Sequence, residues 1–316
     1  MNIKNVVLIG GGVLGSQIAY QTAYKGFNVT IWLRSDDSIG RSKPKIERLH
    51  GIYAEELERT KVSLGGNPVY SRGLISNIES ITEKDIDDLK LKSDKAYESI
   101  KFTTDLTAAV ADADLIIEAL AEDVNQKTEF YRKLAPLMPE KTIVVTNSST
   151  LLPSQFAEAT GRPEKYMALH FANEIWRNNT AEVMGHVATS KKVYDIVAKF
   201  AEDIGMVPLL LKKEQPGYIL NSMLVPFLSA AEMLLAKEIA DPQTIDMTWK
   251  LATGSPAGPF QILDIVGLTT AYNIVIMNPE VKNPESIPGK IAAILKEYID
   301  AGKTGVNAGE GFYKYK

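Results

Sequence analysis

Residues 6–19, VVLIGGGVLGSQIA, decide the fold of this chain. An apolar run leads into glycines spaced as GxGxxG, and a helical pattern begins directly after them. In that spacing Gly10 permits a tight turn, Gly12 lets the backbone approach a pyrophosphate, and Gly15 lets the strand and the helix pack closely. The first amides of the helix carry the positive end of its dipole. The alternative is a glycine-rich turn without a ligand. The motif predicts a dinucleotide site at Gly10, Gly12, Val13, Leu14 and Gly15.

Short β-branched runs alternate with helical patterns from the start of the chain to about residue 211. The runs lie at residues 6–9, 29–33, 115–117, 142–146, 167–171 and 207–211. Continuously apolar strands with helices between them indicate a parallel sheet that is covered on both faces. The predicted fold class is therefore α/β: a Rossmann-type, doubly wound, mainly parallel sheet, followed by an all-α C-terminal domain.

Two departures from this rhythm divide the chain. A charged stretch with helical spacing and few apolar positions intervenes early, which predicts exposed helices that project from the sheet edge. After residue 217 the pattern becomes helical, over residues 218–240, 242–252 and 288–301. We predict a dinucleotide-binding domain over residues 1–213 with a helical insertion at 35–103, and a helical domain over residues 214–316 for substrate binding and dimerisation.

Composition narrows the possible partners. The 316 residues carry a formal net charge of -4, so the chain offers no field that would hold nucleic acid or an anionic membrane. The chain has no cysteine, which excludes disulfides and thiolate metal ligands and fits a reducing compartment; the cytoplasm is the expected location, and no metal site is expected. Glycines break the N-terminal apolar run and no apolar stretch is long enough to span a membrane, so no targeting segment is expected.

The end of the second strand, NVTIWLRSDD at residues 28–37, bears on the choice of nucleotide. A carboxylate at this point would bind the adenosine ribose, whereas an arginine can accept a 2′-phosphate. Here Arg34 offers a planar donor fork and Ser35 a hydroxyl, which together suit a phosphate monoester. We therefore expect NADP to be favoured over NAD. The alternative is that Arg34 is an ordinary surface arginine and Asp36 reaches the ribose.

A second group of motifs runs from the third of these apolar runs onward. Residues 115–157 read LIIEALAEDVNQKTEFYRKLAPLMPEKTIVVTNSSTLLPSQFA, and residues 162–174 read RPEKYMALHFANE. The order strand, Glu-Ala, acidic helix start, strand, Asn-Ser-Ser, proline turn, strand and His-Phe resembles the 3-hydroxyacyl-CoA dehydrogenase family. The likeness continues through PGYILNSMLVPFLSAAEMLL and SPAGPFQILDIVGL to the closing GEGFYKYK. It implies hydride transfer between a nicotinamide dinucleotide and a hydroxyl-bearing carbon.

Oxidation of a secondary alcohol also requires a base for the hydroxyl proton, and histidine serves efficiently near neutral pH. The chain has three histidines, His50, His170 and His186. His170 ends a predicted strand, at the edge where ligands gather in such folds, whereas His50 lies in the charged insertion. The resemblance makes His170 the catalytic base and Glu182 the carboxylate that orients it. Two alternatives stay open: His186, four residues after Glu182 on an apparent strand, can pair with that carboxylate, and His170 can be structural.

The resemblance assigns further polar residues. Ser149 and Asn221 match the family's hydrogen-bond donors to the substrate oxygen at the reacting carbon. Neutral donors suit this role, because they stabilise the alkoxide-like charge of the transition state without neutralising the base. Ser149 can instead cap a helix, and Asn221 can be a buried helical polar group. Asn147 and Glu118 resemble cofactor-side positions near the nicotinamide.

The sequence departs from the family pattern after the predicted base. The family usually has His-Phe-Phe-Asn-Pro, whereas this chain reads HFANEIWRNNTAEV from His170. Ala172 opens space, Glu174 replaces a proline, and Trp176 with Arg177 adds bulk and charge close to the base. These changes predict a remodelled acyl pocket.

We therefore predict an enzyme that interconverts a 3-hydroxy and a 3-oxo small molecule, with a 3-hydroxyacyl-CoA as the first candidate, and that forms a homodimer. A rival is a dehydrogenase of a free hydroxy acid, sugar acid or diketone that does not use CoA. The other rival is a non-catalytic dinucleotide-binding protein. The insertion, where the family binds part of CoA, contains basic residues that match no individual CoA contact: Lys43, Lys45, Arg48, Arg59 and Lys61.

Overall fold

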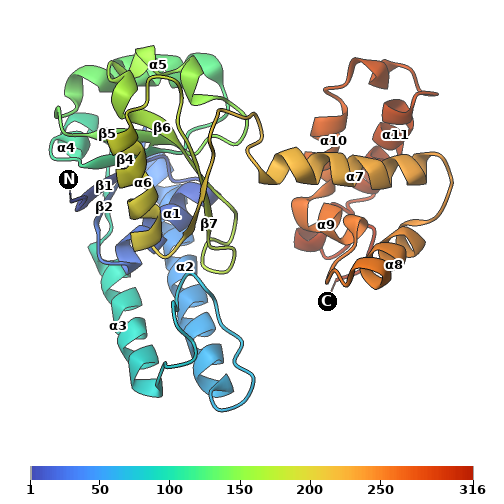
Figure 1. The fold of residues 1–316 in the computed structure, drawn as a ribbon, viewed down its shortest axis with the longest axis horizontal. Helices are drawn as coiled ribbons and strands as arrows, with labels where there is room; N and C mark the ends of the chain where they lie inside the picture. The colour runs from blue at the N-terminus through green and yellow to red at the C-terminus, as the bar shows by residue number, and fades with distance from the viewer. Residues whose placement is uncertain (1, 316) are drawn as a thin grey trace. The chain divides into compact units, whose positions relative to one another are not determined.

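The computed structural model describes residues 2–315 and consists of two compact units (Figure 1). The N-terminal unit ends at Ile219 and the C-terminal unit begins at Leu220. The sequence predicts a domain boundary near residue 213, whereas in the structure residues 214–219 still belong to the N-terminal unit. This matters for the site, because that segment contacts predicted catalytic residues.

An eight-stranded sheet forms the frame of the N-terminal unit. Its strands are β1 (Asn5–Ile9), β2 (Asn28–Trp32), β3 (Lys101–Thr103), β4 (Leu115–Glu118), β5 (Ile143–Thr146), β6 (Tyr166–Phe171), β7 (Thr180–Met184) and β8 (Val207–Leu210). Their order is β3-β2-β1-β4-β5-β6-β7-β8, and every neighbouring pair is parallel except the antiparallel pair β6 and β7. The prediction of a mainly parallel, doubly wound sheet is confirmed.

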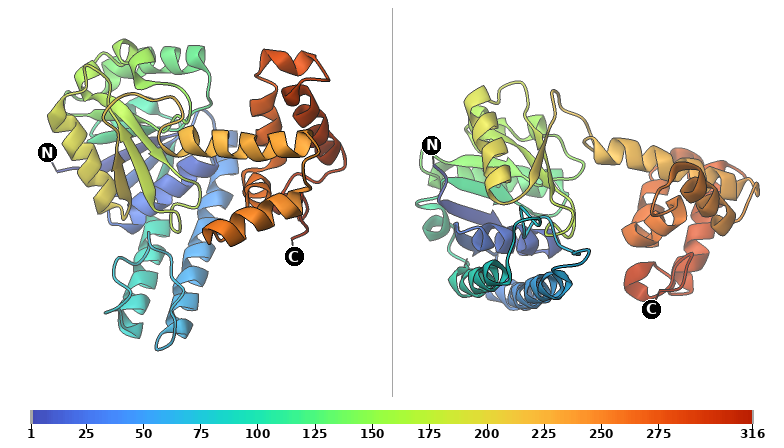
Figure 2. Two further views of the ribbon diagram at one scale, coloured as in Figure 1. Left: turned by 45° about the vertical axis from the view of Figure 1, so that its right-hand side comes forward. Right: turned by 60° about the horizontal axis from the view of Figure 1, so that its bottom comes forward.

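The alternation of side chains along each strand separates two cores. The helices of this unit are α1 (Val13–Tyr24), α2 (Asp36–Ser63), α3 (Glu83–Ser99), α4 (Leu106–Val110), α5 (Val124–Leu134) and α6 (Lys191–Asp203). In β1, Val6 and Leu8 join a core with α1, α2, α3 and α6, while Val7 and Ile9 join a second core with α4 and α5. Helices thus cover both faces of the sheet, as Figures 1 and 2 show, and this explains why the central strands are continuously apolar.

The charged insertion forms α2 and α3, which lie side by side in Figures 1 and 2. Thr82 begins α3 with a capping box. The fully buried ring of Tyr53 on α2 meets Tyr20 and Tyr24 of α1 edge-on, with ring centroids 4.7 and 5.4 Å apart. The prediction of exposed helices is therefore wrong in part, because α2 buries a stripe of side chains at helical spacing in the main core: Ile46, Leu49, Tyr53 and Leu57.

The C-terminal unit is helical, as predicted. Its helices are α7 (Leu220–Ala236), α8 (Pro242–Thr253), α9 (Pro259–Val266), α10 (Leu268–Val275) and α11 (Ile287–Asp300). Buried Asp264 accepts hydrogen bonds from the amides of Phe312 and Tyr313 and from the hydroxyl of Tyr315, which fixes the closing segment of the chain. Within residues 2–315 no helix is both long enough and apolar enough to cross a membrane.

Candidate active site

The glycine loop joins β1 to α1 at the carboxyl edge of the sheet. Gly10 has φ +108°, and a Cβ there would lie 2.8 Å from a backbone oxygen of the loop after β4, so this position requires glycine. A Cβ on Gly15 would lie 2.5 Å from the oxygen of Gly10. A Cβ on Gly12 would meet nothing within 4 Å, and Gly12 is exposed. The open space at the helix N-terminus, beside the amides of Val13 and Leu14, fits a dinucleotide pyrophosphate.

The end of β2 leads directly into α2. The Ser35 hydroxyl accepts the amide of Ser38 at 3.3 Å and caps the helix, and Asp36 lies in the first turn. Arg34 is exposed at the strand end. Because the hydroxyl of Ser35 already accepts a hydrogen bond from α2, Arg34 is the more available of the two predicted 2′-phosphate ligands. Both assignments stay predictions.

His170 and Glu182 face each other across the antiparallel pair of strands. They are directly opposite in the register of β6 and β7, so their side chains lie on the same face of the sheet. His170 Nδ1 lies 3.0 Å from Glu182 Oε2, and both side chains are buried. The amide of Ile219 donates to the other carboxylate oxygen, Glu182 Oε1, at 2.9 Å. This geometry holds the imidazole with Nε2 directed away from the carboxylate.

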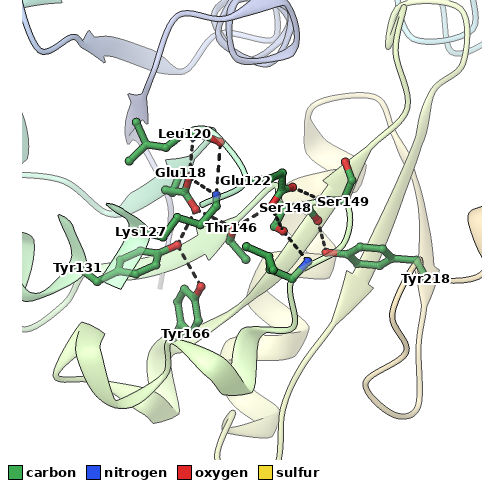
Figure 3. A network of polar contacts seen from close by, with 11 residues as sticks. Glu118, Leu120, Glu122, Lys127, Tyr131, Thr146, Ser148, Ser149, Tyr166 and Tyr218 are labelled. Carbon is green, nitrogen blue, oxygen red and sulfur yellow. Dashed lines mark hydrogen bonds and ion pairs between the residues drawn. The ribbon is translucent and has the colours of Figure 1, made fainter. Parts of the chain in front are cut away.

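Ser149 lies at the Nε2 side of the same imidazole. Its Oγ is 3.2 Å from His170 Nε2, and it follows β5, the strand next to β6. Glu122 clamps the turn that carries this serine: its two carboxylate oxygens accept the amide of Ser149 at 2.6 Å and the hydroxyl of Ser148 at 2.7 Å (Figure 3). The structure thus brings together Ser149, His170 and Glu182 in one hydrogen-bonded series.

Glu118 lies beneath this turn, at the end of β4, and is fully buried. Its carboxylate accepts four hydrogen bonds (Figure 3). The donors are Leu120 N at 2.6 Å, Lys127 Nζ at 2.6 Å, Tyr131 OH at 2.7 Å and Thr146 Oγ1 at 2.8 Å. The side chain is therefore occupied within the protein, and a contact from Glu118 to a cofactor stays a prediction that rests on the resemblance alone.

The other predicted polar residues occupy different places. Asn147 follows β5, and its Oδ1 accepts the amide of Phe171 at 3.0 Å, which ties the ends of β5 and β6 together. Asn221 lies in the first turn of α7, at the start of the C-terminal unit. The roles of Asn147 towards the cofactor and of Asn221 towards the substrate remain predictions.

The two remaining histidines have other partners. β7 ends at Met184, so the prediction that His186 shares a strand face with Glu182 is wrong: a turn follows, and His186 Nε2 lies 3.0 Å from the carbonyl of Pro163. His50 on α2 pairs with Asp94 at 2.8 Å and stacks on Tyr97. Of the three histidines, His170 alone contacts both a carboxylate and a serine hydroxyl.

The segment that departs from the family pattern packs against the insertion. Trp176 is buried in the main core near Tyr53, with ring centroids 6.0 Å apart, and its carbonyl accepts the amide of Gly73 at 2.8 Å. Arg177 forms an ion pair with Glu56 of α2. These contacts correct the expectation that Trp176 and Arg177 add bulk and charge next to the base: their side chains serve to anchor α2.

Comparison with known proteins agrees with this geometry. Residues 5–215 match the family model described as the NAD-binding domain of 3-hydroxyacyl-CoA dehydrogenase, and residues 217–315 match that of its C-terminal domain. The chain belongs to the 3-hydroxyacyl-CoA dehydrogenase family. A nicotinamide dinucleotide is accordingly its cofactor, and the family reaction is an oxidation or reduction.

Three relatives illustrate the range of this family. The mitochondrial hydroxyacyl-coenzyme A dehydrogenase of Rattus norvegicus is 32% identical over 99% of this chain and 92% of its own length. A probable 3-hydroxybutyryl-CoA dehydrogenase of Deinococcus radiodurans is 29% identical over 98% of this chain and 99% of its own length. A solved structure of a diketoreductase, described as acting on dicarbonyl compounds, is 47% identical with a TM-score of 0.85 and covers 100% of both chains.

Sequence reasoning missed two residues of the site. Glu122 lies four residues after Glu118 and accepts hydrogen bonds from Ser148 and Ser149. The sequence pattern indicates only an acidic start to the helix here and gives this residue no role. Tyr218 stacks on the ring of His170, with centroids 4.5 Å apart and planes 15° apart. A tyrosine beside a glycine, long after the strand that carries the base, gives no local signal of this contact.

Proposed function

We propose that this member of the 3-hydroxyacyl-CoA dehydrogenase family interconverts a 3-hydroxy compound and its 3-oxo form, with His170 as the general acid and base. The series Ser149, His170 and Glu182 carries this proposal. It lies at the carboxyl edge of the parallel strands, the same edge as the glycine loop, where ligands bind in doubly wound sheets.

A nicotinamide dinucleotide held at the glycine loop would supply the hydride that reduces the carbonyl carbon. His170 then gives the proton on Nε2 to the carbonyl oxygen, and in oxidation the same nitrogen removes it. Glu182 accepts from Nδ1, which fixes the tautomer and the orientation of the ring. Ser149 donates to the oxygen while charge develops on it, and we assign the same role to Asn221.

For the substrate, we propose a free dicarbonyl or 3-oxo compound ahead of a CoA thioester. The 47% identical diketoreductase supports this choice. The insertion supports it too, because two of the basic residues that the sequence offers for CoA are already in ion pairs. Arg59 pairs with Glu56, and Lys61 pairs with Asp87 at 2.7 Å. Each such cation is less available to the phosphates of CoA.

For the cofactor, we propose a preference for NADP. Arg34 is exposed at the end of β2, and no carboxylate stands at that position. Lys45 lies nearby on α2, with its Nζ 3.2 Å from the carbonyl of Gly11 in the glycine loop. Positive charge on this side of the loop would favour a 2′-phosphate. The family is described as NAD-binding, so a measured preference for NADH would reject this part of the proposal.

A substrate panel tests the proposal. We would compare kcat/KM for acetoacetyl-CoA, for the free 3-oxo acid and for a β-diketone such as pentane-2,4-dione, with NADPH and NADH, at low and high salt. We expect the diketone to be the better substrate, and little salt dependence of its KM, because no phosphate is bound. A clear preference for acetoacetyl-CoA would reverse the substrate assignment. The absence of turnover with all three substrates, together with tight cofactor binding, would favour a non-catalytic protein.

Two further predictions accompany this proposal. A homodimer is expected from the family resemblance and from the apolar C-terminal helices, and the cytoplasm is expected from the composition. Sedimentation equilibrium and fractionation of the source cells would test them.

A further inference from the structure

We propose that Tyr218 is a positioning residue: its ring fixes the plane of the His170 imidazole and so the direction in which Nε2 meets the substrate oxygen. This inference rests on the proposed role of His170. It concerns a side chain that lies far from β6 in sequence and two residues before α7.

The stack is the first observation. The rings of Tyr218 and His170 are nearly parallel, with an interplanar angle of 15° and centroids 4.5 Å apart. Glu182 and Ser149 hold the two nitrogens at the edge of the imidazole, but hydrogen bonds in the ring plane resist tilting only weakly. A flat surface against one face restricts that tilt.

The second observation is how Tyr218 is itself held. Its side chain is 1% exposed, and its hydroxyl donates to the carbonyl of Ser148 at 2.6 Å (Figure 3). Ser148 precedes Ser149, so the tyrosine is bonded to the same turn that presents the serine hydroxyl to His170. Burial, together with the nearby carboxylates of Glu122 and Glu182, raises the pKa of the Tyr218 phenol far above its ordinary value. The hydroxyl therefore stays a donor at every working pH.

The third observation is backbone strain at the same residue. Tyr218 has φ +55°, in the left-handed region that non-glycine residues rarely adopt. Such strain persists where the surroundings hold it, and it gathers at functional sites. The next amide, that of Ile219, donates to Glu182 at 2.9 Å. The turn at Tyr218 thus places a ring against the base and an amide against the partner carboxylate at once.

Removal of the ring should leave substrate binding intact and impair the base. In Tyr218→Leu we expect kcat to fall roughly ten- to a hundredfold while KM for the carbonyl substrate stays unchanged, because the tilt of one group is enough to lose alignment. Tyr218→Phe keeps the ring and should show a smaller loss of kcat, because the flat surface against the imidazole remains.

The measurement that decides is the NMR spectrum of the imidazole ring protons, which needs no activity. The chain has three histidines, so replacement of each by glutamine assigns every signal. In wild type, the ring protons of His170 should be shifted upfield by the phenol ring; the shift should persist in Tyr218→Phe and be lost in Tyr218→Leu. Tyr24→Leu is the matched control, because Tyr24 is also buried and also donates to a backbone carbonyl, that of Leu74. It should leave the ring-proton shifts of His170 and kcat unchanged.

The outcomes separate this inference from the function on which it rests. If His170→Gln abolishes turnover but Tyr218→Leu keeps the wild-type kcat, the role of Tyr218 is wrong and the proposed function stands. If His170→Gln remains active, the proposed function fails whatever Tyr218 does. An absence of the upfield shift in wild type overturns the stack directly, even if Tyr218→Leu does not fold. Equal losses of kcat in Tyr218→Phe and Tyr218→Leu would also overturn it, because the ring would then not be the cause.

Discussion

Replacement of Lys127 by methionine should destabilise the N-terminal unit severely. Lys127 and Glu118 are both completely buried and lie 2.6 Å apart. Methionine has a similar length and no charge, so Lys127→Met removes the cation without leaving a large cavity. Glu118 would then keep hydrogen bonds from the amide of Leu120 and the hydroxyls of Tyr131 and Thr146, but no positive charge would balance its carboxylate. The variant therefore isolates the cost of an unpaired buried charge.

The expected size follows from this burial. Removal of one partner of a buried ion pair costs about 3–5 kcal/mol in the free energy of unfolding. For a unit of more than two hundred residues, each kcal/mol lowers Tm by about 2–4 °C. Together these values predict a fall in Tm of about 6–20 °C. Differential scanning calorimetry and urea denaturation of the full chain would measure it.

Two further variants complete this experiment. Glu118→Gln combined with Lys127→Met removes both charges and should recover roughly half of the lost stability. Lys133→Met, an exposed change on the same helix, should alter stability by less than about 0.5 kcal/mol. A loss below about 1 kcal/mol in Lys127→Met would refute the reasoning, because a buried carboxylate cannot lose its countercharge so cheaply. NADPH affinity of folded Glu118→Gln, measured by fluorescence, tests the cofactor role separately; an affinity equal to wild type would leave Glu118 purely structural.

Four other predictions concern the site and the C-terminal unit. His170→Gln should lower turnover by roughly two to four orders of magnitude with the circular dichroism spectrum unchanged; near-normal turnover would reject it as the base. Ser149→Ala and Asn221→Ala should each lower kcat roughly ten- to a thousandfold, and an effect confined to cofactor affinity would exclude their role at the substrate oxygen. Arg34→Ala should weaken kcat/KM for NADPH roughly ten- to a hundredfold and leave NADH nearly unchanged; equal changes would make Arg34 a bystander. Burial raises the pKa of the Glu232 carboxyl to about 7. The stability that comes with the protonated side chain is therefore fully present below the unfolded pKa of the group, and it is lost as pH rises through 7 and the buried carboxyl ionises. Glu232→Gln should raise Tm at pH 8 but not at pH 4, and an equal gain in Tm at both values would contradict this.

The parts of the fold that sequence predicted well are those that local chemistry determines. Continuous apolar runs identified the central strands, and the glycine motif located the turn after β1 correctly. β3 was missed because it is a three-residue edge strand with no buried residue. The extent of burial in α2 was missed although Ile46, Leu49, Tyr53 and Leu57 recur at helical spacing, because the many charged residues between them make the stretch look exposed.

The candidate site shows the same division. The family resemblance selected His170, Ser149 and Glu182, and the structure brings these three together. What sequence did not reveal is the means by which they are held. Lys127 and Glu118 are only nine residues apart in sequence and form a buried ion pair. The sequence around them does not distinguish this pair from charges on a solvated helix face.

The reversal of strand direction after β6 explains how base and carboxylate can meet at all. In a wholly parallel sheet, Glu182 could be opposite His170 only after a long crossover. Here the chain returns through the segment that anchors α2, enters β7 antiparallel, and places the carboxylate directly opposite the base. Two of the residues that depart from the family pattern, Trp176 and Arg177, lie in this return and contact α2, so the segment that joins base to carboxylate is also attached to the insertion.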